Sequence, residues 1–184
     1  MKQQIIERFL GISCAWMDAG RKAEAECYSV DYMDVVFRYK YGGVGFGCKG
    51  MPGGTSIAVY SNGDVVKCEY DFGDNEPIER IVLAKLPELA KSVAEIIARN
   101  ADKLKTIPDF LNNGTLDAPG DYLTFGKKNI TAWCIQRTNR DDVRSNYYEG
   151  YKDNIVYENA VLDLYDEIAE EINKRDVGIK LVIK

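Results

Sequence analysis

Histidine is absent from this chain of 184 residues, and its absence removes several common chemistries at once. Histidine is the usual general base of enzymes and the commonest protein ligand for transition metals. A serine or cysteine nucleophile would therefore need a lysine, a carboxylate or a chain terminus as its base. No motif around the five cysteines supplies such a pairing. The sequence predicts a protein that is not an enzyme and has no catalytic residues, cofactor or metal ion.

A glycine-rich segment carries a pattern that resembles a phosphate-binding loop. Residues 45–50 formally match G-x-G-x-x-G. A dinucleotide site requires this pattern between a strand and a helix, whereas the residues after it lead into another predicted strand. We therefore expect a glycine-rich connection between strands, which glycine permits at low steric cost. The alternative is a weak anion-binding loop formed by Gly45, Gly47, Lys49 and Gly50.

Acidic side chains gather near the C-terminal end, on a helix predicted to begin near residue 153. They are Asp163, Asp166, Glu167, Glu170 and Glu171. Their spacing places them on one side of the helix, away from its apolar stripe. We interpret them as an acidic face, which is either solvated or presents phosphate-like charge to a basic partner. A divalent cation shared by Asp163 and Glu167 is the metal-binding alternative, although metal sites in helical bundles normally include histidine.

A segment rich in tyrosine and arginine precedes that helix. It contains Arg140, Arg144, Tyr147, Tyr148 and Tyr151. Tyrosine and arginine are enriched among the residues that contribute most to protein–protein binding, so we interpret the segment as a partner-binding surface. Packing of the tyrosines beneath the helix is the alternative. Stacking on single-stranded bases is disfavoured by the acidic residues nearby.

Charge and cysteine usage restrict the class of partner and the compartment. The net charge is −5 and the sequence pI is near 4.9, whereas a surface that binds duplex DNA normally shows a basic excess. No segment approaches the roughly 18 consecutive apolar residues of a membrane span. The cysteines are odd in number and form no Cys-x-x-Cys pair, which favours reduced thiols in the cytoplasm. Glu7 and Arg8 interrupt the apolar N-terminal stretch and argue against a signal peptide.

The N-terminal segment is predicted to form an amphipathic helix. Ile5, Phe9, Ile12 and Trp16 recur at helical spacing, and the helix is expected from residue 2 into the mid-20s. Its apolar stripe would pack on the core of the same chain. The alternative is an interface for a homodimer or another partner.

A β-region follows in the first half of the chain. Residues 33–41 are aromatic and β-branched, and residues 57–61 and 64–70 flank Asn62-Gly63. This dipeptide favours the positive φ angles of a type I′ turn, so the sequence predicts a tight hairpin. A helical stretch is predicted to begin just before Pro77 and to break at Pro87. The next helix should bury Leu89, Val93, Ile96, Ile97 and Leu104 and pair Glu95 with Arg99 on another face.

The second half repeats this order of elements. Residues 122–125 and 130–135 flank residues 126–129 as a second hairpin. The acidic helix then follows, with a predicted core face of Tyr157, Val161, Leu164, Tyr165, Ile168 and Ile172. Residues 178–183 alternate as a strand does, after a turn at Gly178. Hairpin and helix therefore occur twice.

This order predicts one α+β domain over residues 1–184, with an antiparallel sheet and helices packed on one face. It divides into the N-terminal helix (1–27) and two hairpin–helix units (30–105 and 106–184). We expect a non-enzymatic protein that binds another macromolecule, most simply a protein; a basic nucleic-acid-binding protein or ribonucleoprotein is one candidate for that target. By analogy of type alone, it resembles small acidic inhibitor and immunity proteins of mobile elements, including anti-CRISPR proteins. A small enzyme or ligand-binding domain and a self-associating structural module are the alternatives.

Overall fold

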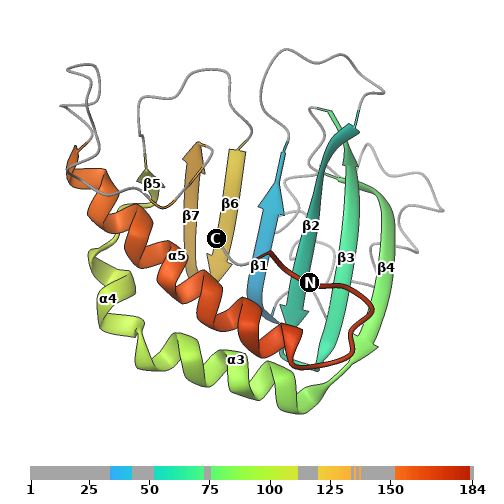
Figure 1. Ribbon diagram of the computed structural model, residues 1–184. Helices are drawn as coiled ribbons and strands as arrows, with labels where there is room; N and C mark the ends of the chain where they lie inside the picture. Colours follow the sequence, from blue (N-terminus) through green and yellow to red (C-terminus); the bar gives the residue numbers. More distant parts are fainter. Residues whose placement is uncertain are drawn as a thin grey trace, which may run out of the picture.

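Strands from both halves of the chain pair in one seven-stranded sheet, in the order β4-β3-β2-β1-β6-β7-β5 (Figure 1). The computed structural model describes residues 34–42, 52–72, 76–111, 120–133, 135, 137 and 152–182. The strands are β1 (Val35–Tyr41), β2 (Pro52–Tyr60), β3 (Asp64–Asp71), β4 (Pro77–Lys85), β5 (Phe110–Leu111), β6 (Gly120–Phe125) and β7 (Lys128–Trp133). Antiparallel pairing of β1 with both β2 and β6 joins the two predicted units, and only β5 pairs in parallel, with β7, among these strands.

Helices lie on one face of this sheet. They are α3 (Pro87–Arg99), α4 (Ala101–Thr106) and α5 (Lys152–Asn173). Figure 1 shows α5 running diagonally across the front of the strands, with α3 beside it along their lower ends. This arrangement confirms the predicted α+β class, an antiparallel sheet with helices packed on one face. No helix in the described part of the chain has both the length and the apolar character needed to cross a bilayer.

The main core lies between these helices and the sheet. The strands contribute Phe37, Ile57, Val59, Val65, Leu123, Phe125, Ile130 and Ala132. Five of the six residues predicted for the core face of α5, Val161, Leu164, Tyr165, Ile168 and Ile172, are buried in the same cluster, and the sixth, Tyr157, packs against it partly buried. Burying each large apolar side chain contributes about 1.5–3 kcal/mol, so this layer is the principal source of stability.

The opposite face of the sheet carries a second, smaller cluster. It contains Ala58, Tyr60, Val66, Cys68 and Tyr70. The Lys40 ammonium lies 3.9 Å from the centre of the Tyr70 ring, and burial lowers the pKa of Lys40 from its ordinary value. Cys68 is a buried free thiol whose pKa is raised by burial, so it acts as a packing residue of this cluster. The predicted N-terminal helix lies outside the described residues.

The predicted hairpin at Asn62-Gly63 is confirmed, but the turn differs from the one expected. The Gly63 amide donates to the Tyr60 carbonyl at 2.9 Å, which places Ser61 and Asn62 at the centre of the turn. Gly63 follows with φ 92°, so the connection is the longer hairpin loop that ends in a glycine bulge. A Cβ atom on Gly63 would lie 2.5 Å from the backbone nitrogen of Pro87. The start of α3 therefore requires glycine here.

The segment after this hairpin is a strand, and the predicted helical stretch from Pro77 is wrong. Residues 77–85 form β4, which pairs with β3 at the edge of the sheet. Ile78, Ile81 and Val82 are β-branched and favour a strand. Pro77 is the first residue of the edge strand, one of the few strand positions that tolerate proline. There is thus no helix to break at Pro87, and Pro87 is instead the first residue of the next helix, α3.

The second hairpin is confirmed and is tighter than predicted, because Phe125 pairs with Lys128 across a two-residue turn. The C-terminal tail differs from its prediction. Residues 178–182 form no strand, although Gly178 makes the predicted turn with φ 74°. The Asn173 side chain at the end of α5 accepts from the Leu181 amide and donates to the Leu181 carbonyl, both at 2.8 Å. These bonds take the place of pairing with a neighbouring strand.

Candidate functional site

The acidic face predicted on α5 is largely paired with cations of the same chain. Arg137 donates to Asp163 at 2.7 Å and to Asp166 at 2.5 Å, and Lys103 lies 3.7 Å from Asp163. These two carboxylates raise the pKa of Arg137. A basic partner would have to compete with this guanidinium for both groups, which lowers the gain from binding them.

Further along α5, Glu167 forms an ion pair with Arg99 of α3. The predicted pairing of Arg99 with Glu95 is therefore replaced by a contact between helices. Glu171 pairs with the two cations that follow it in the chain. Glu170 is exposed and forms no ion pair within the described residues. Of the five predicted carboxylates, Glu170 is the one left available for a partner.

The other predicted partner-binding and anion-binding residues lie outside the described part of the chain. They are Arg140, Arg144, Tyr147, Tyr148 and Tyr151 of the tyrosine–arginine segment, and Gly45, Gly47, Lys49 and Gly50 of the glycine-rich segment. Their predicted roles stay predictions.

A buried polar centre lies between β1, β6 and α5. Asp121 is fully buried. The Tyr39 hydroxyl donates to its Oδ1 atom at 2.6 Å, and the Ile135 amide donates to Oδ2 at 2.7 Å. Burial and this hydrogen bond raise the pKa of Tyr39. The Tyr165 ring meets the Tyr39 ring edge-on, with centroids 5.0 Å apart, so both tyrosines are fixed in place.

Glu158 of α5 is the second carboxyl group of this centre. Its side chain is 2% exposed, and its Oε1 atom has no hydrogen-bond partner. Burial, together with the negative charge of Asp121, raises the pKa of Glu158 to about 7. Such a pKa suits a general acid, but burial keeps substrates away from both carboxyl groups. Above this pKa the centre lowers the stability of the fold, because the ionised Glu158 carboxylate is buried and its Oε1 atom has no hydrogen-bond partner.

The most exposed apolar surface of the described strands lies on β4. Ile78, Ile81 and Val82 are 63%, 41% and 57% exposed. Register shifts interrupt the pairing of β4 with β3 at both ends, but residues 79–82 pair in regular register. Because β4 is the last strand of the sheet among the described residues, the second side of this regular stretch faces away from β3. Exposed edges of this kind are templates for another strand.

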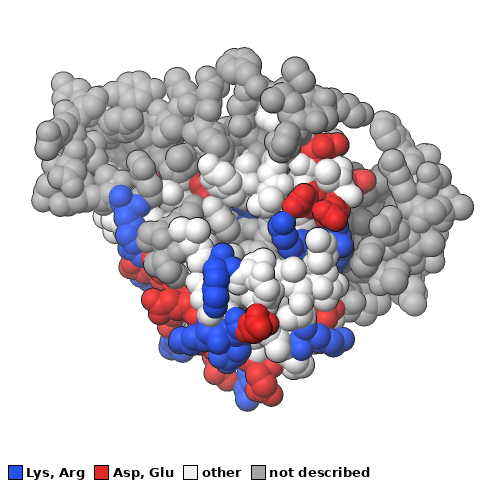
Figure 2. All heavy atoms as spheres, turned by 45° about the vertical axis from the view of Figure 1, so that its right-hand side comes forward, with Lys and Arg blue, Asp and Glu red and all other residues white. Residues whose placement is uncertain are grey.

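Aliphatic side chains lie on both faces of the sheet at this edge. Ile81 stands opposite Lys67 and Val82 opposite Val66, and successive strand residues point to opposite faces. An added strand would thus find an aliphatic contact on each face. Figure 2 turns this side of the molecule forward and shows blue and red side chains interspersed around uncharged surface. This edge therefore favours a partner strand with apolar side chains and does not favour one sign of charge.

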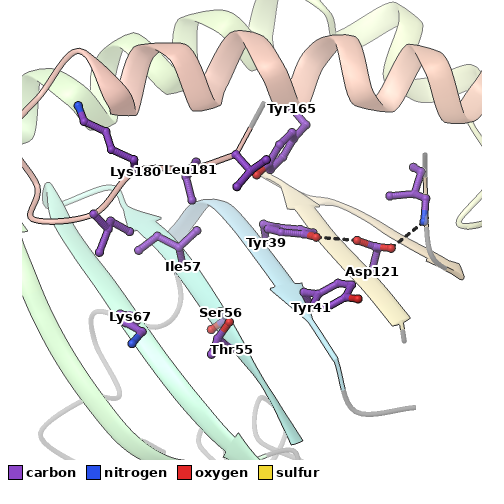
Figure 3. A pocket seen from close by; sticks show the side chains of 13 residues that line it. Tyr39, Tyr41, Thr55, Ser56, Ile57, Lys67, Asp121, Tyr165, Lys180 and Leu181 are labelled. Atoms are coloured by element: carbon purple, nitrogen blue, oxygen red, sulfur yellow. Dashed lines mark hydrogen bonds between the residues drawn. The ribbon is translucent and has the colours of Figure 1, made fainter. Parts of the chain in front are cut away.

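A cavity of about 560 Å³ opens beside the buried centre, between the sheet and the C-terminal tail (Figure 3). It is lined by Tyr39, Tyr41, Thr55, Ser56, Ile57, Lys67, Asp121, Ile135, Tyr165, Ile179, Lys180, Leu181 and Val182. Most of this lining is aromatic or aliphatic. Figure 3 shows Leu181 of the tail over Ile57 of β2, with Tyr39 and Tyr165 beside them.

Known proteins offer no guide to the role of these features. Comparisons with protein-family models, with curated proteins and with solved structures found no match. Within the described ranges, no three acidic or cysteine side chains are grouped so that they could hold a metal ion. The function must therefore be inferred from the exposed edge, the cavity and the charges.

Proposed function

We propose that this protein is a non-enzymatic binding protein of the cytoplasm that captures an extended segment of another protein at the edge of β4. The observation that carries this proposal is the exposure of Ile78, Ile81 and Val82 on a nine-residue edge strand. Addition of a strand to an exposed edge is a common mode of peptide recognition, in which backbone hydrogen bonds supply affinity and alternate side chains supply specificity.

The chemistry of the edge defines the partner. A segment with aliphatic side chains opposite Ile81 and Val82 would remove these exposed groups from water, at a gain of about 25 cal/mol for each Å² of apolar surface. The charged residues of the strand, Glu79, Arg80 and Lys85, are of mixed sign, so no strongly charged partner is required. By occupying such a segment, a small protein would block the target's own use of it, which agrees with an inhibitor or immunity-type role.

The proposal is tested with peptides selected on the protein itself. A displayed library of random 12-residue peptides is selected on the immobilised full chain, and the affinity of an enriched peptide is measured by fluorescence anisotropy. Val82→Lys adds a charged side chain of the kind that protects natural edge strands. We expect it to weaken peptide binding at least tenfold, or about 1.4 kcal/mol.

Val156→Lys is the matched control. Val156 is 56% exposed, which matches the 57% exposure of Val82. It lies in the first turns of α5, which are near β5 and β7 in Figure 1, at the other end of the strand order from β4. Equal loss of binding in the two variants would contradict the proposal. Light scattering adds a second check, because a dimer that Val82→Lys dissociates would show that a second copy, not another protein, occupies the edge.

A further inference from the structure

The cavity beneath the C-terminal tail is preformed by contacts within the chain. Asn173 holds the backbone of Leu181 with two hydrogen bonds of 2.8 Å, and Val177, one turn of the tail earlier, is 1% exposed. The roof of the cavity is thus held at Leu181, and the tail is anchored in the core just before it reaches the cavity. A ligand would not have to order this part of the tail on binding, which removes one of the usual entropic costs.

The accessible charge in this cavity is positive. Its ionisable lining residues with formal charge are Asp121, Lys67 and Lys180. Asp121 is fully buried, and both of its oxygens already accept hydrogen bonds from the chain. Figure 3 shows the two lysines on the side of the cavity away from Tyr39 and Asp121. The cavity is therefore apolar along its length and cationic at one side.

Lys67 is the better placed of the two lysines to meet an anion. Its ammonium pairs with Glu69 at 2.7 Å, and the two side chains are 35% and 39% exposed. Ion pairs at such exposed positions contribute little stability, so the ammonium can also bind a ligand carboxylate. Lys180 donates to the carbonyl of Asn173 at the end of α5. Its charge adds to the positive potential at the mouth of the cavity.

We infer that this cavity binds a small aliphatic carboxylate, with its chain between Ile57 and Leu181 and its carboxylate at Lys67. The volume of about 560 Å³ falls within the roughly 300–1,000 Å³ of small-molecule sites, which combine an apolar lining with a few polar groups. An alcohol of the same length would fill the cavity without satisfying the lysine, and an ammonium would be repelled by it. This inference does not depend on the proposal for β4.

The test uses three probes that share one chain and differ in charge. Octanoate, 1-octanol and octylammonium are titrated into the full-length protein by isothermal calorimetry. Octanoate should bind about tenfold more tightly than 1-octanol, as expected for a charge-assisted hydrogen bond, and octylammonium more weakly than both. Equal affinity for the three probes, or no binding of octanoate, would overturn the inference.

A pair of variants locates the carboxylate. Lys67→Met keeps the aliphatic stem and should lower the affinity for octanoate to that for 1-octanol. Lys105→Met is the matched control, because Lys105 is an exposed lysine of α4 in an ion pair with Asp102 and does not line the cavity. Circular dichroism checks that both variants are folded. If Lys105→Met weakens octanoate binding as much as Lys67→Met does, octanoate binds by general electrostatic attraction and the site is refuted.

Discussion

Replacement of Glu158 by glutamine should change the pH dependence of stability in a defined direction. The pKa of Glu158 is raised from 4.5 to about 7 in the folded protein. Below pH 4.5 the group is protonated in both the folded and the unfolded chain. As the pH rises towards 7, the unfolded chain releases this proton while the folded chain retains it, and the folded state loses relative stability. Above pH 7 the loss is complete.

The size of this loss follows from the same pKa values. A displacement from 4.5 to about 7 corresponds to about 3 kcal/mol, at 1.36 kcal/mol for each pH unit. Glu158→Gln has nearly the same shape and no charge at any pH. The variant should therefore be more stable than the wild type by about 3 kcal/mol at pH 8, which corresponds to about 6–12 °C in melting temperature, and equally stable at pH 4.

The assay is urea unfolding of the two proteins at pH 4, 6 and 8, followed by circular dichroism. Glu170→Gln serves as the control, because Glu170 is exposed on the same helix and should give the same difference from wild type at every pH. A Glu158→Gln variant that parallels the wild type across this range would refute the reasoning. So would a variant that is less stable at pH 8, since it would show that the ionised carboxylate is stabilised by its surroundings.

Three further substitutions or probes test the fold. Gly63→Ala should destabilise the protein by at least about 1 kcal/mol in thermal unfolding, because its Cβ atom would meet Pro87. Gly126→Ala is the control and should cost less, because no atom lies within 4 Å of the added Cβ atom. The reverse order of the two losses would contradict the described turn. Arg137→Gln should lower the free energy of unfolding in urea by no more than about 1 kcal/mol, and the difference from wild type should disappear in high salt. A large loss that does not depend on salt would contradict an exposed ion pair. The Cys68 thiol should react with a disulfide reagent only at the rate of unfolding, and fast labelling at this position by mass spectrometry would show that it is accessible.

Features fixed by neighbouring residues could be predicted from the sequence. The hairpin at Asn62-Gly63, the start of α3 at Pro87 and the apolar stripe of α5 each depend on a few adjacent residues. Their confirmation follows from local backbone preferences and periodicity. The exact turn at Asn62-Gly63 was missed because the close approach of Pro87 to Gly63 involves a residue 24 positions away.

Features that depend on the sheet could not be predicted in the same way. The sequence predicts a helix where β4 lies, because proline is common at helix starts and residue 77 is a proline. The pairing with β3 that makes this segment a strand is not visible in its own sequence. The sequence predicts a pair between Arg99 and Glu95 on one helix. In the structure α3 packs on α5, and Arg99 forms its ion pair with Glu167 of α5 instead. Four of the five carboxylates of the acidic face are thus paired within the chain, and its role as a partner-binding surface stays a prediction.

Of the two buried carboxyl groups, Glu158 could be anticipated from its position in the sequence. Glu158 lies three residues before Val161 and seven before Tyr165, which places it on the apolar stripe of α5. A charged residue in that position indicates either a buried partner or a shifted pKa. Asp121 gave no comparable signal, because its burial depends on Tyr39 and Ile135, which are distant in the sequence.

Amide hydrogen exchange of β4 tests the central claim most directly. The exchange of residues 77–85 is measured by mass spectrometry in the free protein and with a saturating peptide selected on it. If the peptide pairs with the edge, amides of β4 should become protected, with slower exchange than in the free protein, and Val82→Lys should remove the effect. Binding that leaves β4 exchange unchanged and protects other segments would contradict capture of an extended segment at this edge.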